Sequence, residues 1–408
     1  MGSNRSKLKK YNVVDLFCGA GGFSLGLKDT NRFNSILAND IDMDMCEAYS
    51  LNFPESKILS KSISDLDFLS IKKENNIDVV VGGPPCQAYS LSGKRLKNDP
   101  RANLFLEYFR AIKVIRPNIF VYENVKGLFS YKKGTIFYQL REIFEKIGYN
   151  LSINLVNALN YGVPQSRERV FIIGYKKGKT FYQLRETFEK IGYALSINLV
   201  NALNYGVPQS RERIFIIGYK KGLNYSFPKS SHAKKTIRKP VTISDAISDL
   251  PKIKNNENSA KYLSKPKTNY QKLMRKNAPD NLMDHKSSKH SENLVTIMSY
   301  LPEGGLKKDL PFKIRPKSGY ANSYGRLWWN KPATTITRNF GTPSSARCIH
   351  PKIDRALTTR EGARLQSFPD RYQFFGSRAK KNLQIGNAVP PLLARAIGKS
   401  ISLALDKL

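Results

Sequence analysis

The chain has 408 residues, of which 40% are hydrophobic, so it can bury a substantial core and is not expected to be disordered. Its 68 Lys and Arg outnumber 32 Asp and Glu, and the net charge of +36 favours a polyanionic partner, nucleic acid first. No apolar run of about 18 residues predicts a membrane span, and the N-terminus lacks the apolar segment of a signal peptide. Four scattered cysteines fit neither a disulfide framework nor a zinc site, so we expect a cytoplasmic protein.

Strands and helices alternate along the first third of the chain. Strands are predicted at residues 12–17, 35–39, 78–82 and 119–123, and a helix at residues 104–115. Strands separated by helices are typical of a parallel sheet. We therefore predict an α/β fold with a doubly wound, Rossmann-like sheet.

The middle of the chain contains an internal repeat. Residues 137–178 recur as residues 181–222, with 39 of 42 positions identical. Each copy predicts a helix followed by a β-hairpin, whose strands in the first copy are residues 151–158 and 170–175. Solenoid proteins need three or more repeats to build a core, so we interpret the pair as a tandem duplication within one fold.

Residues 223–352 form a region of different composition. They contain 25 Lys and Arg against 8 Asp and Glu, a net charge of +17, and few long apolar runs. Helices are predicted again at residues 358–367 and 391–405. We predict a catalytic and cofactor-binding domain at 1–222, a smaller basic domain at 223–352, and a return to the first domain at 353–408.

Two segments point to a nucleoside-containing ligand. The first strand runs into a glycine-rich turn, Asp15 to Ser24, which allows a ligand to approach the backbone closely. Asp40 ends the second strand, where a carboxylate can accept hydrogen bonds from ribose hydroxyls. The alternatives are a turn that binds nothing and a helix N-cap at Asp40.

A third segment presents a possible nucleophile. Pro84 and Pro85 fix the backbone before Cys86 at the carboxyl edge of the sheet, which suits a reactive thiol better than the alternative of an inert buried cysteine. Glu123 ends the next strand and is expected in the same crevice as a proton donor or hydrogen-bonding group.

These motifs resemble those of DNA (cytosine-5) methyltransferases. The matching segments are Asp15 to Phe23, Asn39-Asp40, Gly82 to Ser90, Arg101 to Phe105, Glu123-Asn124-Val125, Gln165 to Arg169 with its duplicate Gln209 to Arg213, Arg355 to Asp370, and Gln384 to Pro390. They cover the chain almost from end to end, except residues 223 to about 346, which in this family read the target sequence. The resemblance implies S-adenosylmethionine as cofactor and double-stranded DNA as partner, with no metal.

The resemblance also implies catalytic roles. Cys86 adds to C6 of a flipped-out cytosine, Glu123 contacts N3 and the 4-amino group, and the second arginine of the Gln-x-Arg-x-Arg motif, Arg169 or Arg213, reaches O2. The loop after Cys86 is a predicted lid over DNA, although it could be an ordinary solvated loop. The predicted DNA contacts are Ser90, Lys94, Arg95, Lys97, Arg101, Arg167, Arg211 and Arg338.

For the cofactor, the resemblance assigns the Phe17 ring to adenine and Asp40 to the ribose. The other cofactor residues it implies are Gly19, Gly21, Gly22, Ile41, Pro84, Asn387 and Val389. The chain departs from the family at Ser62, where an acidic residue usually binds the adenine amino group, and Asp65 lies three residues later. Either Ser62 substitutes weakly or the register shifts.

Several alternatives remain at this stage. The crevice has room for one arginine of the duplicated motif, and we expect Arg169 and Arg213 to differ greatly in importance, with a slight preference for the first copy; equal losses would favour interchange. The chain could also be a DNA-binding protein that has lost activity, or an RNA methyltransferase. The long basic region favours duplex DNA. We expect a monomer of bacterial type, associated with the nucleoid through DNA.

Overall fold

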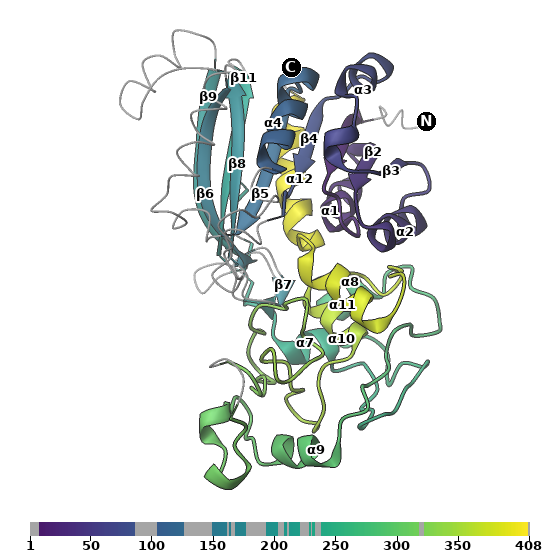
Figure 1. Ribbon diagram of the computed structural model, residues 1–408, viewed down its shortest axis with the longest axis vertical. Helices are drawn as coiled ribbons and strands as arrows, with labels where there is room; N and C mark the ends of the chain where they lie inside the picture. Colours follow the sequence, from purple (N-terminus) through teal and green to yellow (C-terminus); the bar gives the residue numbers. More distant parts are fainter. Residues whose placement is uncertain are drawn as a thin grey trace, which may run out of the picture.

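The computed structural model describes residues 8–85, 104–125, 238–317 and 322–406, with short pieces between 149 and 232. Within 149–220 it describes only the backbone of strands, so the predicted helix of each repeat lies outside the described residues. Figure 1 shows an upper part built on a sheet and a lower part made of loops and short helices. The C-terminal helices connect the two parts.

The sheet has nine strands in the order β11-β9-β6-β8-β5-β4-β1-β2-β3. Strands β1 to β5 pair in parallel, and β8 joins β5 antiparallel. The bounds are β1 (Tyr11–Leu16), β2 (Phe33–Asp40), β3 (Lys57–Ser60), β4 (Val79–Gly82), β5 (Ile119–Val125), β6 (Tyr149–Asn160), β8 (Glu168–Lys176), β9 (Tyr193–Ala202) and β11 (Glu212–Lys220). Short strands β7 (Val163–Pro164) and β10 (Pro208–Gln209) pair separately. The predicted α/β fold with a mainly parallel sheet is confirmed.

Helices connect the parallel strands. They are α1 (Gly22–Lys28), α2 (Met43–Asn52), α3 (Phe68–Glu74) and α4 (Leu104–Ile115). Helix α1 packs closely on the C-terminal helix α12 (Pro391–Leu405), and Gly26 makes this possible. A Cβ on Gly26 would lie 2.4 Å from the Pro391 carbonyl oxygen, so any larger residue would push the two helices apart.

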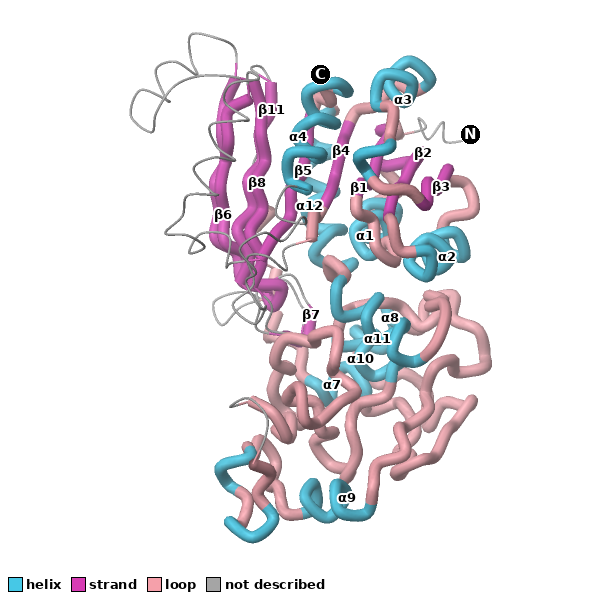
Figure 2. Tube along the Cα trace, in the orientation of Figure 1, coloured by secondary structure: helices cyan, strands magenta, loops and turns pink. Residues whose placement is uncertain are grey.

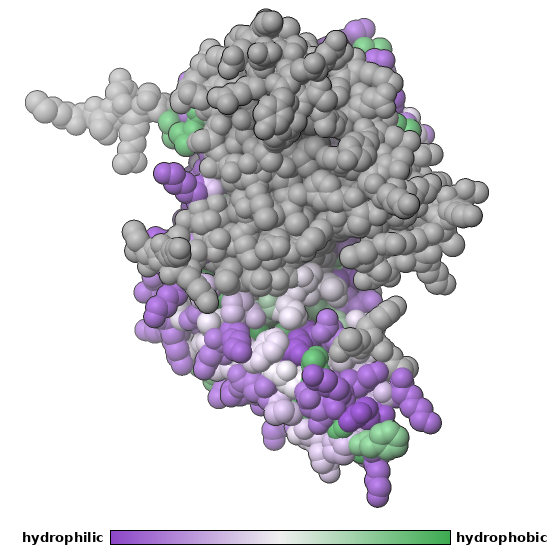
Figure 3. Space-filling view, turned by 90° about the vertical axis from the view of Figure 1, so that its left-hand side faces the viewer, coloured by the Kyte–Doolittle hydropathy of each residue, from purple (hydrophilic) through white to green (hydrophobic). Residues whose placement is uncertain are grey.

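The lower part contains most of the basic region, residues 223–352. Its helices are short: α7 (Ile243–Ile247), α8 (Asn269–Met274) and α9 (Glu292–Ser299). Figure 2 shows that loops make up most of it, and Figure 3 shows that the described part of its surface is mainly hydrophilic. The core does not stop at the predicted domain boundary, since one apolar cluster joins Tyr49 and Phe53 of α2 to Ile243 and Tyr270 of the basic region.

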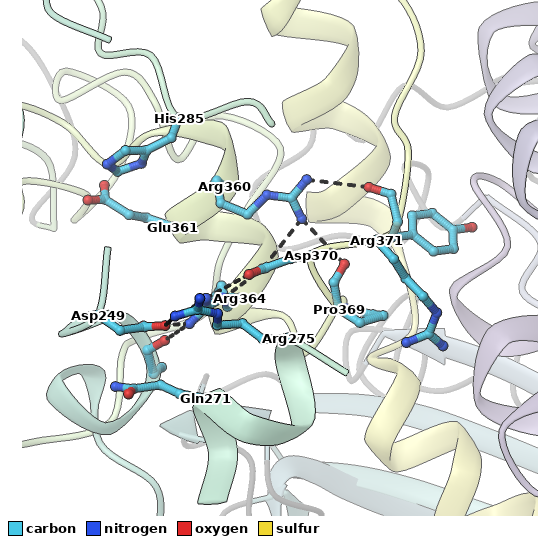
Figure 4. Close-up of polar contacts among 12 residues, drawn as sticks. Asp249, Gln271, Arg275, His285, Arg360, Glu361, Arg364, Pro369, Asp370 and Arg371 are labelled. Carbon is cyan, nitrogen blue, oxygen red and sulfur yellow. Dashed lines mark hydrogen bonds and ion pairs between the residues drawn. The ribbon is translucent and has the colours of Figure 1, made fainter. Parts of the chain in front are cut away.

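Helix α10 (Thr359–Leu365) joins the basic region to the rest of the chain through buried arginines (Figure 4). Arg364, fully buried, pairs with Asp249 of the basic region at 2.9 Å and with Asp370 at 2.7 Å. Arg355, also fully buried, pairs with Glu361 at 2.8 Å. We call this set of ion pairs the α10 joint.

The return of the chain to the sheet is made by α11 (Arg378–Asn387) and α12. Residues 378–405 are long enough and apolar enough to cross a membrane, but 61% of their apolar 18-residue stretch is buried inside the protein. The residues between the two helices break the stretch, and α12 lies against α1, so this segment belongs to the core.

Candidate active site

The turn after β1 has an unusual backbone. Phe17 adopts φ +56°, a left-handed conformation that non-glycine residues rarely take, and Gly19 and Gly21 follow at φ +53° and +76°. The turn leads straight into α1, with Gly21 as its N-cap. The strain at Phe17 holds its side chain at the wall of a cavity instead of in the core.

Asp40, at the end of β2, faces this turn. Its Oδ2 accepts a hydrogen bond from the Gly19 N–H at 2.9 Å, and its Oδ1 accepts one from the Asp42 N–H at 3.0 Å. Burial raises the pKa of Asp40 above its ordinary value. Asp42, not Asp40, caps α2, since its side chain accepts from the Asp44 and Met45 N–H groups, so the N-cap alternative for Asp40 is wrong.

A second carboxylate, Asp15, lies on the cavity wall behind Asp40. Its side chain is 2% exposed and accepts a hydrogen bond from the Ser24 hydroxyl at 2.6 Å. Burial, with a smaller contribution from Asp40, raises the pKa of Asp15 to about 7. Asp15 therefore carries only part of its charge at neutral pH.

The ends of β4 and β5 are tied together on the other side of the cavity. Asn124 donates a hydrogen bond from its side chain to the Pro84 carbonyl at 3.2 Å. Gly83 lies against Glu123, since a Cβ on Gly83 would sit 3.0 Å from Glu123 Oε2. The Pro84-Pro85 segment, which leads directly into Cys86, is thus held beside the Glu123 carboxylate.

The returning chain closes the cavity. A Cβ on Gly22 would lie 2.5 Å from the Val389 carbonyl oxygen, so glycine is required for this contact. Gly386 allows an equally close approach to the backbone of Arg338, whose amide nitrogen would lie 2.3 Å from an added Cβ. Arg338, in the basic region, therefore reaches the same cavity as the first turn of the sheet.

The resulting cavity measures about 440 Å³. Glu123 and Arg338 lie on its wall together with most of the predicted cofactor residues. These cofactor residues are Phe17, Gly19, Gly22, Asp40, Ile41, Pro84, Asn387 and Val389. Gly21 is not on its wall and packs instead against Phe53 and Tyr49. The cavity opens to a strongly exposed apolar side chain, Ile41, which is 72% exposed.

Other predicted residues cannot be placed. Cys86 and the predicted DNA contacts Ser90, Lys94, Arg95, Lys97, Arg101, Arg167 and Arg211 lie outside the described residues. Arg169 and Arg213 are described by their backbones alone. Among the residues that the structure describes, no group of His, Cys, Asp and Glu could hold a metal ion.

The residues after β3 also reach the cavity. Ser62 lies on the wall and Asp65 does not, so the chain reaches the cavity at Ser62 without a shift of register. Ile63 follows Ser62 into the wall and is 3% exposed. Its sequence signal is its position just beyond the end of β3, as Ile41 lies just beyond the end of β2.

The fold and the cavity define the class of protein first. A crystal structure of an E. coli protein, described as a DNA modification methyltransferase encoded within a prophage, matches 97% of this chain and 100% of its own length with a TM-score of 0.71 and 25% identity. A Dnmt2 methyltransferase from S. pombe has the same fold, with a TM-score of 0.56 and 16% identity. The chain has a Rossmann-like methyltransferase fold.

Sequence comparison gives the family. The model for C-5 cytosine-specific DNA methylases matches residues 11–183 and again residues 176–403. Type II methyltransferase M1.HphI of Haemophilus parahaemolyticus is 34% identical over 95% of this chain and 86% of its own, and M.DdeI of Desulfomicrobium norvegicum is 35% identical over 96% and 88%. The chain belongs to the C-5 cytosine-specific DNA methylase family and is a DNA cytosine-5 methyltransferase.

Proposed function

We propose that the protein transfers the methyl group of S-adenosylmethionine to C5 of a cytosine that is flipped out of a specific duplex DNA sequence, through a covalent bond between Cys86 and C6. The observation that carries the proposal is the cavity, which puts the Pro84-Pro85 segment and Glu123 next to the glycine-rich turn and Asp40. A base and a methyl donor could therefore meet within one crevice.

The cavity suits S-adenosylmethionine. The Phe17 ring and Ile41 provide apolar surface for a flat adenine, and each Asp40 oxygen keeps a lone pair for a ribose hydroxyl beyond its backbone hydrogen bond. Gly19 and Gly22 leave the backbone open for the methionine end. When bound, this cofactor supplies an electrophilic methyl group.

Cys86 and Glu123 make the cytosine ring able to accept a methyl group. Because C5 is a poor nucleophile, addition of the Cys86 thiolate to C6 turns C5 into a nucleophilic enamine carbon. Glu123 holds N3 and the 4-amino group and stabilises the charge that develops during the addition. Loss of the C5 proton and elimination of the thiolate then restore the ring and free Cys86.

DNA is held by positive charge on both sides of this crevice. The base must leave the stack to reach Cys86, and the basic loop residues after Cys86 and the Gln-x-Arg-x-Arg arginines are placed by the resemblance to contact the opened duplex. Arg338 is exposed and lies on the cavity wall, where it can reach a phosphate or base edge. We propose that the protein acts as a monomer on cytoplasmic DNA, as a methyltransferase of the restriction-modification type.

The test is transfer of a labelled methyl group from S-adenosylmethionine to duplex DNA, followed by bisulfite sequencing. The unchanged chain should methylate cytosine within one short sequence. Cys86→Ser should reduce transfer by on the order of 1000-fold or more, because a hydroxyl replaces the attacking thiolate. Asp40→Ala should weaken cofactor binding and leave DNA binding unchanged.

Three results would contradict the proposal. Absence of C5 methylation on all DNA tested would favour a DNA-binding protein without activity. Methylation that persists at the same rate in Cys86→Ser would exclude the covalent route. Methyl transfer to RNA with none to duplex DNA would move the substrate to the RNA class.

A further inference from the structure

The duplicated unit leaves two candidates for one place in the sheet. The first family match ends at residue 183, just after the first copy, and the second begins at residue 176, just before the second copy. Each match therefore contains one complete copy. The first copy matches the family together with the chain before it, and the second copy matches together with the chain after it.

The place in question lies beside the strand that carries Glu123. Strand β8 of the first copy pairs with β5, so that Arg169 stands opposite Val125 in the backbone register. On its other side, β8 pairs with β6, and Arg169 stands opposite Val156. The Gln-x-Arg-x-Arg arginine is thus brought to the end of β5 that faces the cavity.

Strand β11 of the second copy has the same register on β6. Arg213, which is equivalent to Arg169, stands opposite Val156, and Glu212 stands opposite Asn157 in the same antiparallel sense. Along its whole length β11 pairs with β9 of its own copy, in the register that β8 has on β6. The two copies therefore form the same hairpin, and the outer strand of the second copy has the same backbone pattern to offer to β5 as β8 has.

The sequence on both sides of the unit is similar for either arrangement. The tetrapeptide Tyr-Lys-Lys-Gly occurs at residues 131–134, before the first copy, and again at 175–178 and 219–222, at the end of each copy. With the first copy in place, residues 179–222 are an insertion after one tetrapeptide; with the second in place, residues 135–178 are an insertion after another. In both arrangements the inserted copy follows a Tyr-Lys-Lys-Gly segment.

The sequence differences between the copies are small. They are Ile143 and Thr187, Asn150 and Ala194, and Val170 and Ile214. Val170 pairs with Asn124 on β5, and the equivalent isoleucine is also β-branched and suits a strand. The two arrangements should therefore have similar free energies.

We propose that the two copies exchange in the place beside β5, so that Arg169 and Arg213 serve the active site in turn. This changes the expectation drawn from sequence that one copy alone is used. The role of the arginine rests on the proposed methyl transfer, but the exchange itself is a property of the sheet and can be measured without activity.

Activity separates exchange from fixed use. Arg169→Ala and Arg213→Ala should each keep about half of the methyl transfer, because the other copy still fills the place. The double variant should lose on the order of 100-fold, as expected for loss of one charge-stabilising contact. A loss in Arg169→Ala or in Arg213→Ala alone as large as in the double variant would overturn exchange. An active double variant would remove the proposed role of the arginine, and the protection of β8 and β11 would then decide whether the copies exchange.

Hydrogen exchange measured by mass spectrometry gives the second readout. Val170 and Ile214 make peptides from β8 and β11 distinguishable by mass. Two control chains, lacking residues 179–222 or 135–178, each retain one copy with unchanged junctions. Both strands should lose much of their protection in the full chain compared with the control chain that retains them, whereas full protection of either strand in the full chain would overturn the proposal.

The two readouts also separate this proposal from the function. If the unchanged chain transfers no methyl group, the proposed function fails, while the exchange data still decide whether the copies compete. If the chain is active and one strand keeps full protection, exchange fails and the function stands.

Discussion

Two groups of buried carboxylates in this protein have opposite surroundings. At the cavity, Asp15 and Asp40 accept hydrogen bonds from neutral donors, and burial raises the pKa of both. At the α10 joint, burial would also raise the pKa of Glu361 and Asp370, but Arg355 and Arg364 outweigh it and lower both values. Burial raises the pKa in both places, and the paired cation decides the net direction of the shift.

The comparison shows how the two regions divide their tasks. The oxygens of Asp40 keep acceptor capacity that a ligand can use, since no lysine or arginine in the described part of the chain forms an ion pair with it. The oxygens of Glu361 and Asp370 are occupied by guanidinium groups within the protein. The cavity is arranged for binding, and the joint fixes the basic region to α10 and the chain that follows it.

The largest expected effect is at the joint. Arg364→Met should lower the free energy of unfolding by about 3 to 5 kcal/mol, because it leaves Asp249 and Asp370 buried without their cation. Denaturant unfolding measures the change. Lys380→Met is the matched control, since Lys380 pairs with Asp44 at 2.7 Å on the surface, where solvent screens the ion pair, and its loss should change the free energy of unfolding much less. Equal losses in the two variants would show that the joint is not held by these charges.

Acid should lower the free energy of unfolding through His350, which lies near the joint. Burial lowers the pKa of His350 to about 3, so it is neutral in the folded state, and its contact with Glu361 at 3.8 Å is not an ion pair. The unfolded chain binds a proton at this histidine below its ordinary pKa of 6.5, so stability falls as pH drops from 6.5 towards 3, by up to about 1.4 kcal/mol per pH unit. His350→Gln should reduce this slope by about one proton, while His232→Gln, at a partly exposed position, should change it less.

The contribution of Asp15 to stability should depend on pH in the opposite direction. Its pKa is about 7 in the folded state and 3.8 ordinarily, so its contribution to stability is complete below 3.8 and is lost as pH rises through 7. Asp15→Asn should therefore be more stable, relative to the unchanged chain, at pH 8 than at pH 5. Asp370→Asn should show the reverse sign below pH 3.8, since the pKa of Asp370 is lowered and its contribution to stability is lost as pH falls below its ordinary value. The same sign in both variants would remove the distinction between the two groups of carboxylates.

The two regions also differ in how far the sequence predicts them. Helices at 104–115 and 391–405 followed from apolar periodicity, and Phe17, Asp40 and Glu123 were found because each lies at or just beyond the end of a parallel strand. Motifs of this kind are local. They place side chains at one edge of a sheet without knowledge of distant contacts.

The α10 joint could not be predicted in this way. Arginines are normally exposed, so the sequence gives no reason to bury Arg355, Arg360 and Arg364. Asp249, which pairs with Arg364, is 115 residues away in the chain, and only the fold brings them together. The same holds for Arg338, which reaches the cavity because Gly386 lets two backbones touch.

The smallest expected effect tests the acceptor capacity of the cavity. Ser62 lies on the wall where the family usually has an acidic residue, and its hydroxyl contacts that of Ser64 at 2.7 Å. Ser62→Asp should tighten binding of S-adenosylmethionine by about tenfold, since a carboxylate accepts a stronger hydrogen bond from the adenine amino group than a hydroxyl does. Ser64→Asp adds the same charge nearby but off the wall, and a calorimetric titration should show little gain for it. If both variants gain equally, the cofactor responds to net charge and not to a hydrogen bond at this position. If neither gains, adenine does not contact the residue after β3, and its proposed placement must change.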